Sequence, residues 1–249
     1  MRKIAIYTVA FGTNFGFIPQ KKIKDVDFFA FTDDKKKVLK PWKPILVKEN
    51  IKDNERLKAR HVKLLPHLYF SDYDISIFID SNYLIIGDIE KLLESLGNFQ
   101  MGIFDHNQCD DARNCVYKEH EALLELGRQR GVYKDNPDVM EKQIKFLKSE
   151  DYPTENGLIF SAVLVRKHND PQVIKVMEDW WGFVSTQSLR DQLSFDYVAW
   201  KNKFKYTIIP GDLRTGNPYF YFLASNRKSY LWRLIKYRIK NLLNYKLHP

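Results

Sequence analysis

Short apolar runs alternate with helix-forming segments along almost the whole chain, and this alternation restricts the fold to the α/β class. Runs typical of buried strands occupy 4–10, 27–32, 45–47, 101–104, 157–166 and 206–210. Helical patterns or helix-start residues fall between them, at 54–65, 88–96, 115–130, from 136, from 170 and at 188–200. Because no repeat or linker interrupts this order, we predict one domain, 1–226, followed by a tail, 227–249.

One apolar run ends in three polar residues. The segment ISIFI leads directly into Asp80-Ser81-Asn82, which predicts a buried central strand with a polar carboxyl end. In open α/β sheets, ligands bind beyond the carboxyl ends of the strands. Oxygen-bearing side chains at Asp80 and Asn82 can converge on one hard cation, Mg²⁺ or Mn²⁺. The alternative is a capped turn with no ligand.

The sequence lacks the signature motifs of several common functional classes. The sequence holds no Walker A motif, no GxGxxG, no HExxH, no zinc-type CxxC pair and no GxSxG. Two cysteines in 249 residues exclude a disulfide framework. No apolar run approaches the roughly 20 residues of a spanning helix. The basic start followed by IAIYTVAFG resembles a secretion signal, but it is short and lacks a cleavage site, so we predict a cytoplasmic protein.

The net charge of +9 is concentrated at the end of the chain. Residues 227–249 carry seven basic side chains and no acidic one, whereas the rest carries 33 basic and 31 acidic side chains. A nearly neutral body argues against a nucleic-acid partner. The tail has the spacing of a basic amphipathic helix containing Trp232, which is typical of a helix on an anionic membrane surface. We therefore expect peripheral association with the inner face of the membrane; the alternative is docking on its own domain.

A set of motifs in order resembles a known family over most of residues 4–200. The chain is similar to the GT-A-like glycosyltransferase-like domain family, formerly a domain of unknown function, found in plant wall and mucilage proteins and in bacterial polysaccharide loci. The resemblance implies a Rossmann-related mixed sheet flanked by helices. The motifs that carry it are IAIYTVAFG, FFAFTDD, RHVKLLPHLYFSDYD, IDSN, RNCVYKE, ENGL, VRKHN, Trp180-Trp181 and RDQLSF.

The resemblance implies a nucleotide-sugar donor site, with a UDP-sugar favoured. Thr8, Phe11, Gly12 and Asp33 would face the base and ribose, and Arg60 and Lys63 would face the phosphates. Asp80 and Asn82 occupy the position of the DxD motif and would hold Mn²⁺ or Mg²⁺. Because Asn82 is a neutral ligand, Lys63 and Arg60 are the alternative means of neutralising the diphosphate. A solvated helix face is the alternative for Arg60 and Lys63.

The segment Arg190-Asp191-Gln192 resembles the turn that faces the acceptor and the anomeric carbon in these enzymes. Asp191 would be the general base of an inverting reaction, or Asp191 and Gln192 would lie near the oxocarbenium of a retaining one. The alternative is structural, because Ser188 with Asp191 resembles a capping box at a helix start. Residues expected to bind acceptor or sugar are His106, Arg113, Glu119, Asn156 and Arg190.

The implied activity is sugar transfer to a surface-polysaccharide or lipid-linked glycan acceptor at the membrane, as in capsule or lipopolysaccharide synthesis. The alternative is a non-catalytic relative that binds sugar or nucleotide, or that acts as a scaffold, since the second acidic residue of the DxD position is absent.

Overall fold

A computed structural model of the chain describes residues 2–12, 17–47, 54–223 and 227–242, apart from the side chains at both ends of the last helix. Its centre is a seven-stranded sheet in the order β3-β2-β1-β4-β7-β6-β8. The strands are β1 (Ile4–Ala10), β2 (Val26–Thr32), β3 (Lys43–Leu46), β4 (Ile75–Ile79), β6 (Met101–Asp105), β7 (Ile159–Arg166) and β8 (Thr207–Ile209). A second, two-stranded sheet pairs β5 (Tyr83–Ile85) with β9 (Phe220–Phe222). The expected mixed α/β sheet flanked by helices is confirmed.

One strand reverses the direction of the large sheet. β1 runs parallel to β2 and β4, and β6 runs parallel to β8, whereas β7 is antiparallel to both β4 and β6. Since β4 and β6 both oppose β7, they point the same way. The carboxyl ends of β1, β2, β4, β6 and β8 therefore share one edge of the sheet with the start of β7.

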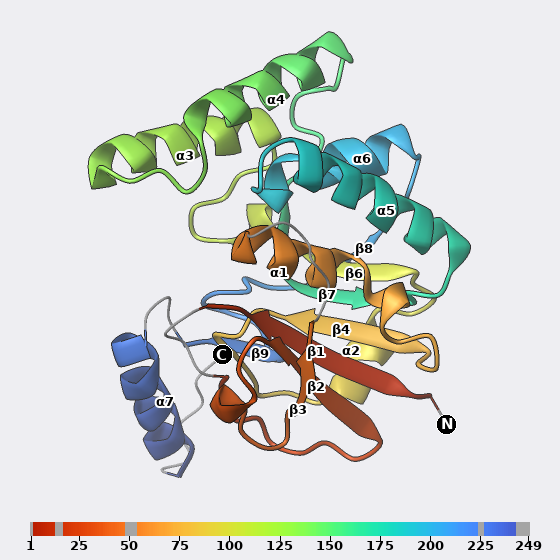
Figure 1. Cartoon of the computed structure of the whole chain (residues 1–249), viewed down its shortest axis with the longest axis vertical. Helices are drawn as coiled ribbons and strands as arrows, with labels where there is room; N and C mark the ends of the chain where they lie inside the picture. Colours follow the sequence, from red (N-terminus) through yellow and green to blue (C-terminus); the bar gives the residue numbers. More distant parts are fainter. Residues whose placement is uncertain (1, 13–16, 48–53, 224–226, 243–249) are drawn as a thin grey trace.

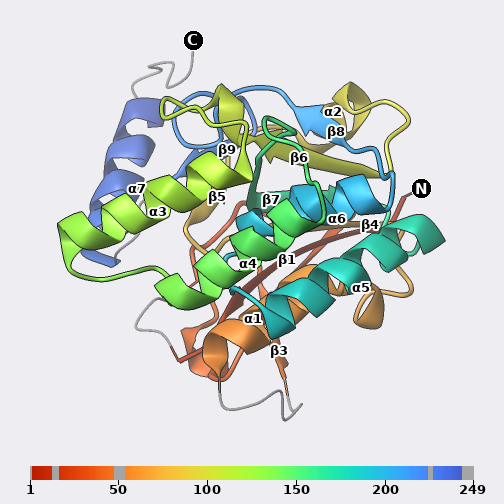
Figure 2. The ribbon, with the colours of Figure 1, turned by 90° about the horizontal axis from the view of Figure 1, so that it is seen from above.

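Helices cover both faces of this sheet (Figure 1). Alternation along β1 places Ala5 and Tyr7 in one core and Ile4 and Ile6 in the other. The first core packs under α1, α4, α5 and α6, and the second under α2 and the small sheet. Figure 2 looks onto the layer that contains α3, α4, α5, α6 and α1. The helices are α1 (Glu55–Leu64), α2 (Ile89–Ser95), α3 (Val116–Arg130), α4 (Pro137–Ser149), α5 (Pro171–Thr186), α6 (Phe195–Lys201) and α7 (Arg227–Leu242).

Local sequence signals explain where most helices begin. Asn54, Asp88, Asn136 and Asp170 each accept hydrogen bonds from the first backbone N–H groups of their helices. Pro137 and Pro171 occupy the first helical positions, where their missing N–H is not needed.

The prediction of a helix from Ser188 to Trp200 is wrong for the first half of this segment. Residues Asp191–Leu193 form a 3₁₀ turn, η4, and α6 begins only at Phe195. The Ser188 hydroxyl donates to Asp135 Oδ2 at 2.6 Å and accepts from the Arg190 backbone N–H, so it fixes a loop rather than a helix start. The capping-box alternative for Asp191 therefore does not describe this segment.

The last helix lies beside the small sheet, separate from the helical layers (Figure 1). Leu234 of α7 is buried in a cluster with Ile18, Leu84 and Leu223. The rings of Tyr237 and Tyr221 lie 5.1 Å apart. Trp232, Ile235 and Ile239 are instead about half exposed, at 59%, 47% and 50%. One side of α7 thus docks on the body, which is the alternative stated above for the tail. A second apolar side faces outward.

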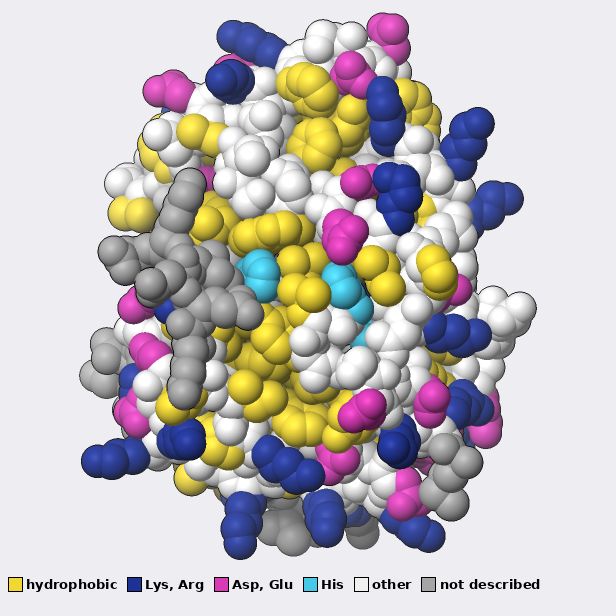
Figure 3. Space-filling view, turned by 45° about the vertical axis from the view of Figure 1, so that its right-hand side comes forward, with side chains coloured by type: hydrophobic (Ala, Val, Ile, Leu, Met, Phe, Trp, Pro, Cys, Tyr) yellow, Lys and Arg dark blue, Asp and Glu magenta, His cyan; other side chains and the backbone are white. Residues whose placement is uncertain are grey.

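Other surface features agree with the nearly neutral body. On the face shown in Figure 3, basic side chains lie around the periphery with acidic ones among them, and apolar side chains gather at the centre beside histidine side chains. Within the described parts of the chain, none of the helices is long and apolar enough to cross a bilayer. Cys109 and Cys115 are buried and free.

Candidate functional site

A buried ion pair lies at the edge of the sheet where the strand ends meet. Lys63 Nζ of α1 lies 2.7 Å from Asp191 Oδ2 of η4, and each side chain is only 2% exposed. Ser161 of β7 donates to the same Asp191 oxygen at 3.0 Å and accepts from Lys63 at 3.1 Å. Arg60 Nε lies 3.5 Å from this oxygen. The structure thus brings together a carboxylate and two cations that the sequence places 128 and 131 positions apart.

Backbone anchors hold both partners of this pair. Tyr7 Oη donates to the Lys63 carbonyl at 2.7 Å, and the fully buried Arg166 donates to the same carbonyl at 3.0 Å. Trp180 Nε1 donates to the Asp191 carbonyl at 3.0 Å. Trp180 is fully buried. The end of α1 and the start of η4 are therefore fixed from the core side.

Two carboxylates of this edge have pKa values shifted in opposite directions. Burial alone would raise the pKa of Asp191, but Arg60, Lys63 and Arg190 hold it well below its usual range. Burial raises the pKa of Asp80, and Lys63 and Arg60 only partly offset that rise. These mutual influences place Asp80 in the same charged cluster as Lys63, Arg60 and Asp191.

The geometry around Asp191 does not favour its predicted role as a general base. A base must be reached by the acceptor hydroxyl and must favour the bound proton. Asp191 is almost completely enclosed, already accepts hydrogen bonds from Lys63 and Ser161, and has a lowered pKa. In this state the carboxylate is a weak proton acceptor, and its contacts suit the positioning of Lys63 and Arg60.

The residues expected at the base and ribose lie at the ends of β1 and β2. The Gly12 backbone N–H donates to Asp33 Oδ2 at 2.7 Å, which ties the two strand ends together. Gly12 has φ of +54°, a backbone conformation that disfavours residues with a side chain, and a Cβ there would also displace the end of the Glu55 side chain. Phe11 is buried beneath the Lys58 ammonium, 5.7 Å from its ring centre. Thr8 is buried further inside β1, away from the surface.

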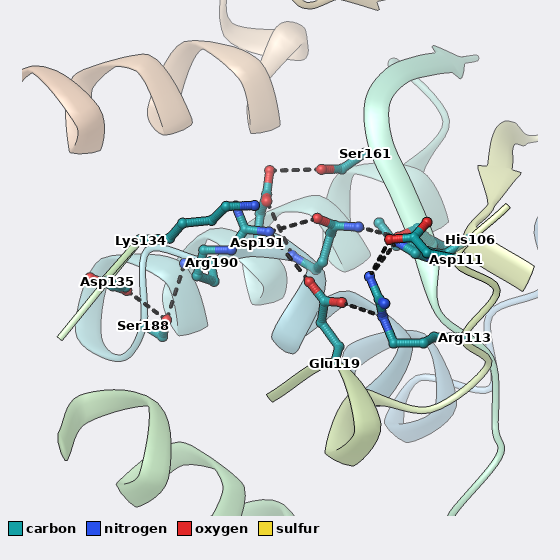
Figure 4. Close-up of polar contacts among 12 residues, drawn as sticks. His106, Asp111, Arg113, Glu119, Lys134, Asp135, Ser161, Ser188, Arg190 and Asp191 are labelled. Atoms are coloured by element: carbon teal, nitrogen blue, oxygen red, sulfur yellow. Dashed lines mark hydrogen bonds and ion pairs between the residues drawn. The ribbon is translucent and has the colours of Figure 1, made fainter. Parts of the chain in front are cut away.

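A cavity of about 350 Å³ lies beside η4. It contains His106, Arg113, Glu119 and Arg190, four of the five residues expected to bind acceptor or sugar, together with Gln192. Glu119 accepts from Arg113 Nε at 2.8 Å and lies 3.5 Å from Arg190 Nη2 (Figure 4). Gln192 accepts from Arg190 at 2.9 Å and donates to the Ile159 carbonyl at 2.9 Å.

The fifth expected residue, Asn156, lies elsewhere. Its side chain is exposed and borders a different cavity, beside Asp196, Trp200 and Tyr206. Its Nδ2 donates to Tyr152 Oη at 3.3 Å. The structure therefore does not bring Asn156 together with the other residues of the expected acceptor site.

Several residues of the site were not expected from the sequence. Ser161 joins the Lys63–Asp191 pair, and Arg214, which follows β8, lines the cavity with its guanidinium 5.2 Å from the Phe160 ring centre. Phe160 also stacks on His106, at 5.5 Å between ring centres. The position of Ser161 near the start of a strand at the ligand edge was the one signal available for it. Arg214 lies in a segment without a motif.

The end of β4 offers few ligands to a divalent cation. Asp80 and Asn82 provide a carboxylate and an amide, and Leu223 N–H donates to the Asn82 carbonyl, which fixes this turn. Among the residues that the structure describes, no group of three or more His, Cys, Asp or Glu side chains is arranged to hold a metal. A cation would therefore need oxygens from a bound diphosphate and from water to complete the six or more that Mg²⁺ or Mn²⁺ takes.

Comparison with known proteins gives the family of the chain. A family model described as TOD1/MUCI70, glycosyltransferase-like domain, matches residues 12–210. No curated protein sequence matches the chain. A solved apo structure of WbbM, a bifunctional glycosyltransferase, aligns with a TM-score of 0.48 and 10% identity. The alignment covers 95% of this chain and 44% of WbbM, so the chain spans less than half of that protein.

Proposed function

Since the chain belongs to the TOD1/MUCI70 glycosyltransferase-like domain family, we propose that it transfers a sugar from a nucleotide-sugar, with a UDP-sugar favoured, to a glycan acceptor. In this reaction the bond between the anomeric carbon and the diphosphate oxygen breaks, and the nucleoside diphosphate leaves with the electron pair. A bond forms from that carbon to an acceptor hydroxyl oxygen, and one proton is released. The leaving diphosphate carries the developing negative charge, so its stabilisation is the main demand on the protein.

The observation that carries this proposal is the cluster of Arg60, Lys63 and Asp80 at the ligand edge of the sheet. Arg60 is 22% exposed, so its guanidinium can reach a ligand while its Nε remains near Asp191. Asp191 and Ser161 orient the Lys63 ammonium, which a flexible four-carbon side chain would otherwise leave mobile. Asp80 and Asn82 would add a divalent cation, Mn²⁺ or Mg²⁺, bound together with the diphosphate.

A ligand screen tests the proposal. We expect UDP to raise the melting temperature of the full chain more than GDP or CMP does. Binding at about 100 times Kd adds roughly 2.7 kcal/mol to the free energy of unfolding. The screen is run with and without Mn²⁺, and a larger UDP shift with Mn²⁺ supports the cation at Asp80 and Asn82. No shift with any nucleotide or nucleotide-sugar contradicts the transferase. Binding without turnover of any donor supports the non-catalytic alternative.

We also propose that α7 holds the protein on an anionic membrane surface in the cytoplasm, where lipid-linked acceptors for capsule or lipopolysaccharide synthesis would be accessible. The support is the outward apolar side of α7, formed by Trp232, Ile235 and Ile239, beside Arg233 and Lys236. Apolar side chains flanked by basic ones match the boundary between lipid headgroups and acyl chains. Leu234 would keep the helix attached to the body while its other side meets the lipid.

The double variant Ile235→Glu/Ile239→Glu is expected to weaken binding to vesicles containing phosphatidylglycerol by more than about tenfold, since each Ile contributes about 1.5–3 kcal/mol when buried. Cosedimentation with vesicles measures the loss. The matched control is Leu39→Glu/Val132→Glu, which adds the same charge at side chains 53% and 72% exposed. Equal loss of binding in both variants would contradict a role for α7. UDP binding should be unchanged in both.

A further inference from the structure

The cavity beside η4 has an excess of positive charge. Five cationic side chains line it: Arg113, Arg130, Lys134, Arg190 and Arg214. Two carboxylates line it as well, Asp111 and Glu119. Burial of the imidazole and the nearby Arg113 lower the pKa of His106, which keeps this side chain neutral near pH 7. The lining therefore carries three more positive than negative charges around about 350 Å³.

Both carboxylates are already shared between cations. Glu119 contacts Arg113 and Arg190 through its two oxygens, and Asp111 contacts Arg113 (Figure 4). Asp111 also contacts Arg214. The remaining cations of the lining, Arg130 and Lys134, add to the same positive field. The pKa of Lys134 is lowered by burial and by the neighbouring charge of Arg190, with further contributions from Arg130 and Arg113. Crowded cations of this kind are stabilised by a bound anion.

One donor of this cluster is unused. Arg190 Nε is buried and has no hydrogen-bond partner in the described structure, although Arg190 Nη2 donates to Gln192. A buried N–H without a partner is costly, and a ligand oxygen can supply the missing acceptor. Guanidinium groups match the oxygens of carboxylates and phosphates better than they match neutral hydroxyls.

Two consecutive residues, Arg190 and Asp191, contact different groups: Arg190 lines the cavity, and Asp191 belongs to the donor cluster of Arg60 and Lys63. Asp191 turns toward Ser161, whereas Arg190 turns toward Glu119 (Figure 4). Asp191 also accepts from Lys63, and Arg190 donates to Gln192. An anion bound by Arg190 in the cavity therefore has other protein partners than a diphosphate bound at Arg60. This arrangement favours a substrate group other than the leaving nucleotide.

We propose that the cavity binds an oxyanion on the acceptor glycan, either the carboxylate of a uronic acid or a sugar phosphate. This assignment rests on the proposed transferase function and adds the chemical class of its acceptor. Arg190 and Arg113 contact the oxyanion, and Arg130 and Lys134 attract it from the cavity rim. The neutral His106, stacked on Phe160, offers an apolar and hydrogen-bonding wall to the sugar ring.

The test compares charged and neutral sugars of the same shape. Titrations of the full chain, in the presence of UDP, use methyl glucuronide and glucose 6-phosphate against methyl glucoside. We expect either or both anionic sugars to bind at least about tenfold more tightly than methyl glucoside, and to weaken as salt rises. A preference for glucuronide alone identifies a uronic acid, and a preference for the phosphate alone identifies a phosphorylated sugar. Equal affinity for all three sugars would overturn the proposal.

Variants test whether the anion binds in this cavity. Arg130→Gln/Lys134→Gln removes two cations from the cavity lining and should reduce the preference for anionic sugars about tenfold. The matched control, Arg128→Gln/Lys142→Gln, removes the same charge from exposed positions on α3 and α4 outside the cavity and should leave the preference unchanged. UDP affinity, measured separately, should be the same in all variants. A parallel loss of UDP affinity in Arg130→Gln/Lys134→Gln would overturn the proposal by assigning the cavity to the nucleotide. Failure of the wild-type chain to bind UDP would instead refute the proposed function.

Discussion

A Lys63→Met variant is expected to lose about 3–5 kcal/mol of unfolding free energy, the usual cost of removing one partner from a buried ion pair. Methionine nearly preserves the volume of lysine, so the loss reports on charge rather than on a cavity. It leaves Asp191 enclosed with Arg60 as its nearest remaining cation, 3.5 Å away. Urea denaturation monitored by circular dichroism measures the effect. The same variant should weaken UDP binding, because Lys63 holds Asp191 beside Arg60, the partly exposed cation that can reach the phosphates.

The matched control for this variant is Lys43→Met. Lys43 also pairs with an aspartate, Asp27, but the two side chains are 61% and 43% exposed. Exposed pairs contribute about 0.2–1 kcal/mol, so the control should remain close to wild type. A loss in Lys63→Met no larger than that of the control would contradict the buried pair.

The pH dependence of the Lys63→Met effect provides a second check. The lowered pKa of Asp191 contributes stability that is present above its ordinary value of 3.8 and is lost as the pH falls below it. Removing Lys63 takes away part of this contribution. The difference between wild type and Lys63→Met should therefore be largest near pH 7 and narrow below about pH 4.

An Arg60→Gln variant is expected to bind UDP about 10–100-fold more weakly, because a hydrogen bond to a charged group contributes about 1.5–3 kcal/mol. Its effect on stability should be smaller than that of Lys63→Met, since Arg60 is partly exposed and Lys63 remains beside Asp191. Titration calorimetry measures the affinity. Arg128→Gln on the exposed side of α3 is the control and should bind UDP normally. Unchanged affinity in Arg60→Gln would remove this residue from the donor site.

The elements of the fold could largely be predicted because their signals are local. The apolar run of β1 gives its bounds, and Asp170 with Pro171 marks the start of α5. The order of the strands and the reversal at β7 depend on contacts between distant segments, for which a single sequence has no pattern. β9 was missed because three residues next to Pro218 carry too little periodicity. The break between η4 and α6 was missed because tertiary contacts of Ser188 and Trp180 override helix propensity there.

Residues of the candidate site could be predicted where a sequence motif contains them. They could not be predicted where only the folding of the chain brings them close together. Lys63 and Asp191 were predicted as site residues from the resemblance and Asp80 also from the strand that precedes it, and the structure brings Lys63 and Asp191 into contact. Their partnership was not foreseen, because residue types reveal which groups are charged but not which of them meet. Ser161 lies 98 positions from Lys63 and appears in the sequence as an ordinary residue of a buried strand.

The adjacency of Arg190 and Asp191 has a consequence for how two ligands would influence each other. A ligand that displaces the backbone of Asp191 must also displace that of Arg190, because the two residues are consecutive and Trp180 holds the Asp191 carbonyl. Such a displacement would link occupancy at Asp191 to affinity at Arg190. Thermodynamic reciprocity requires the nucleotide to change affinity for the second ligand by the same factor as that ligand changes affinity for the nucleotide.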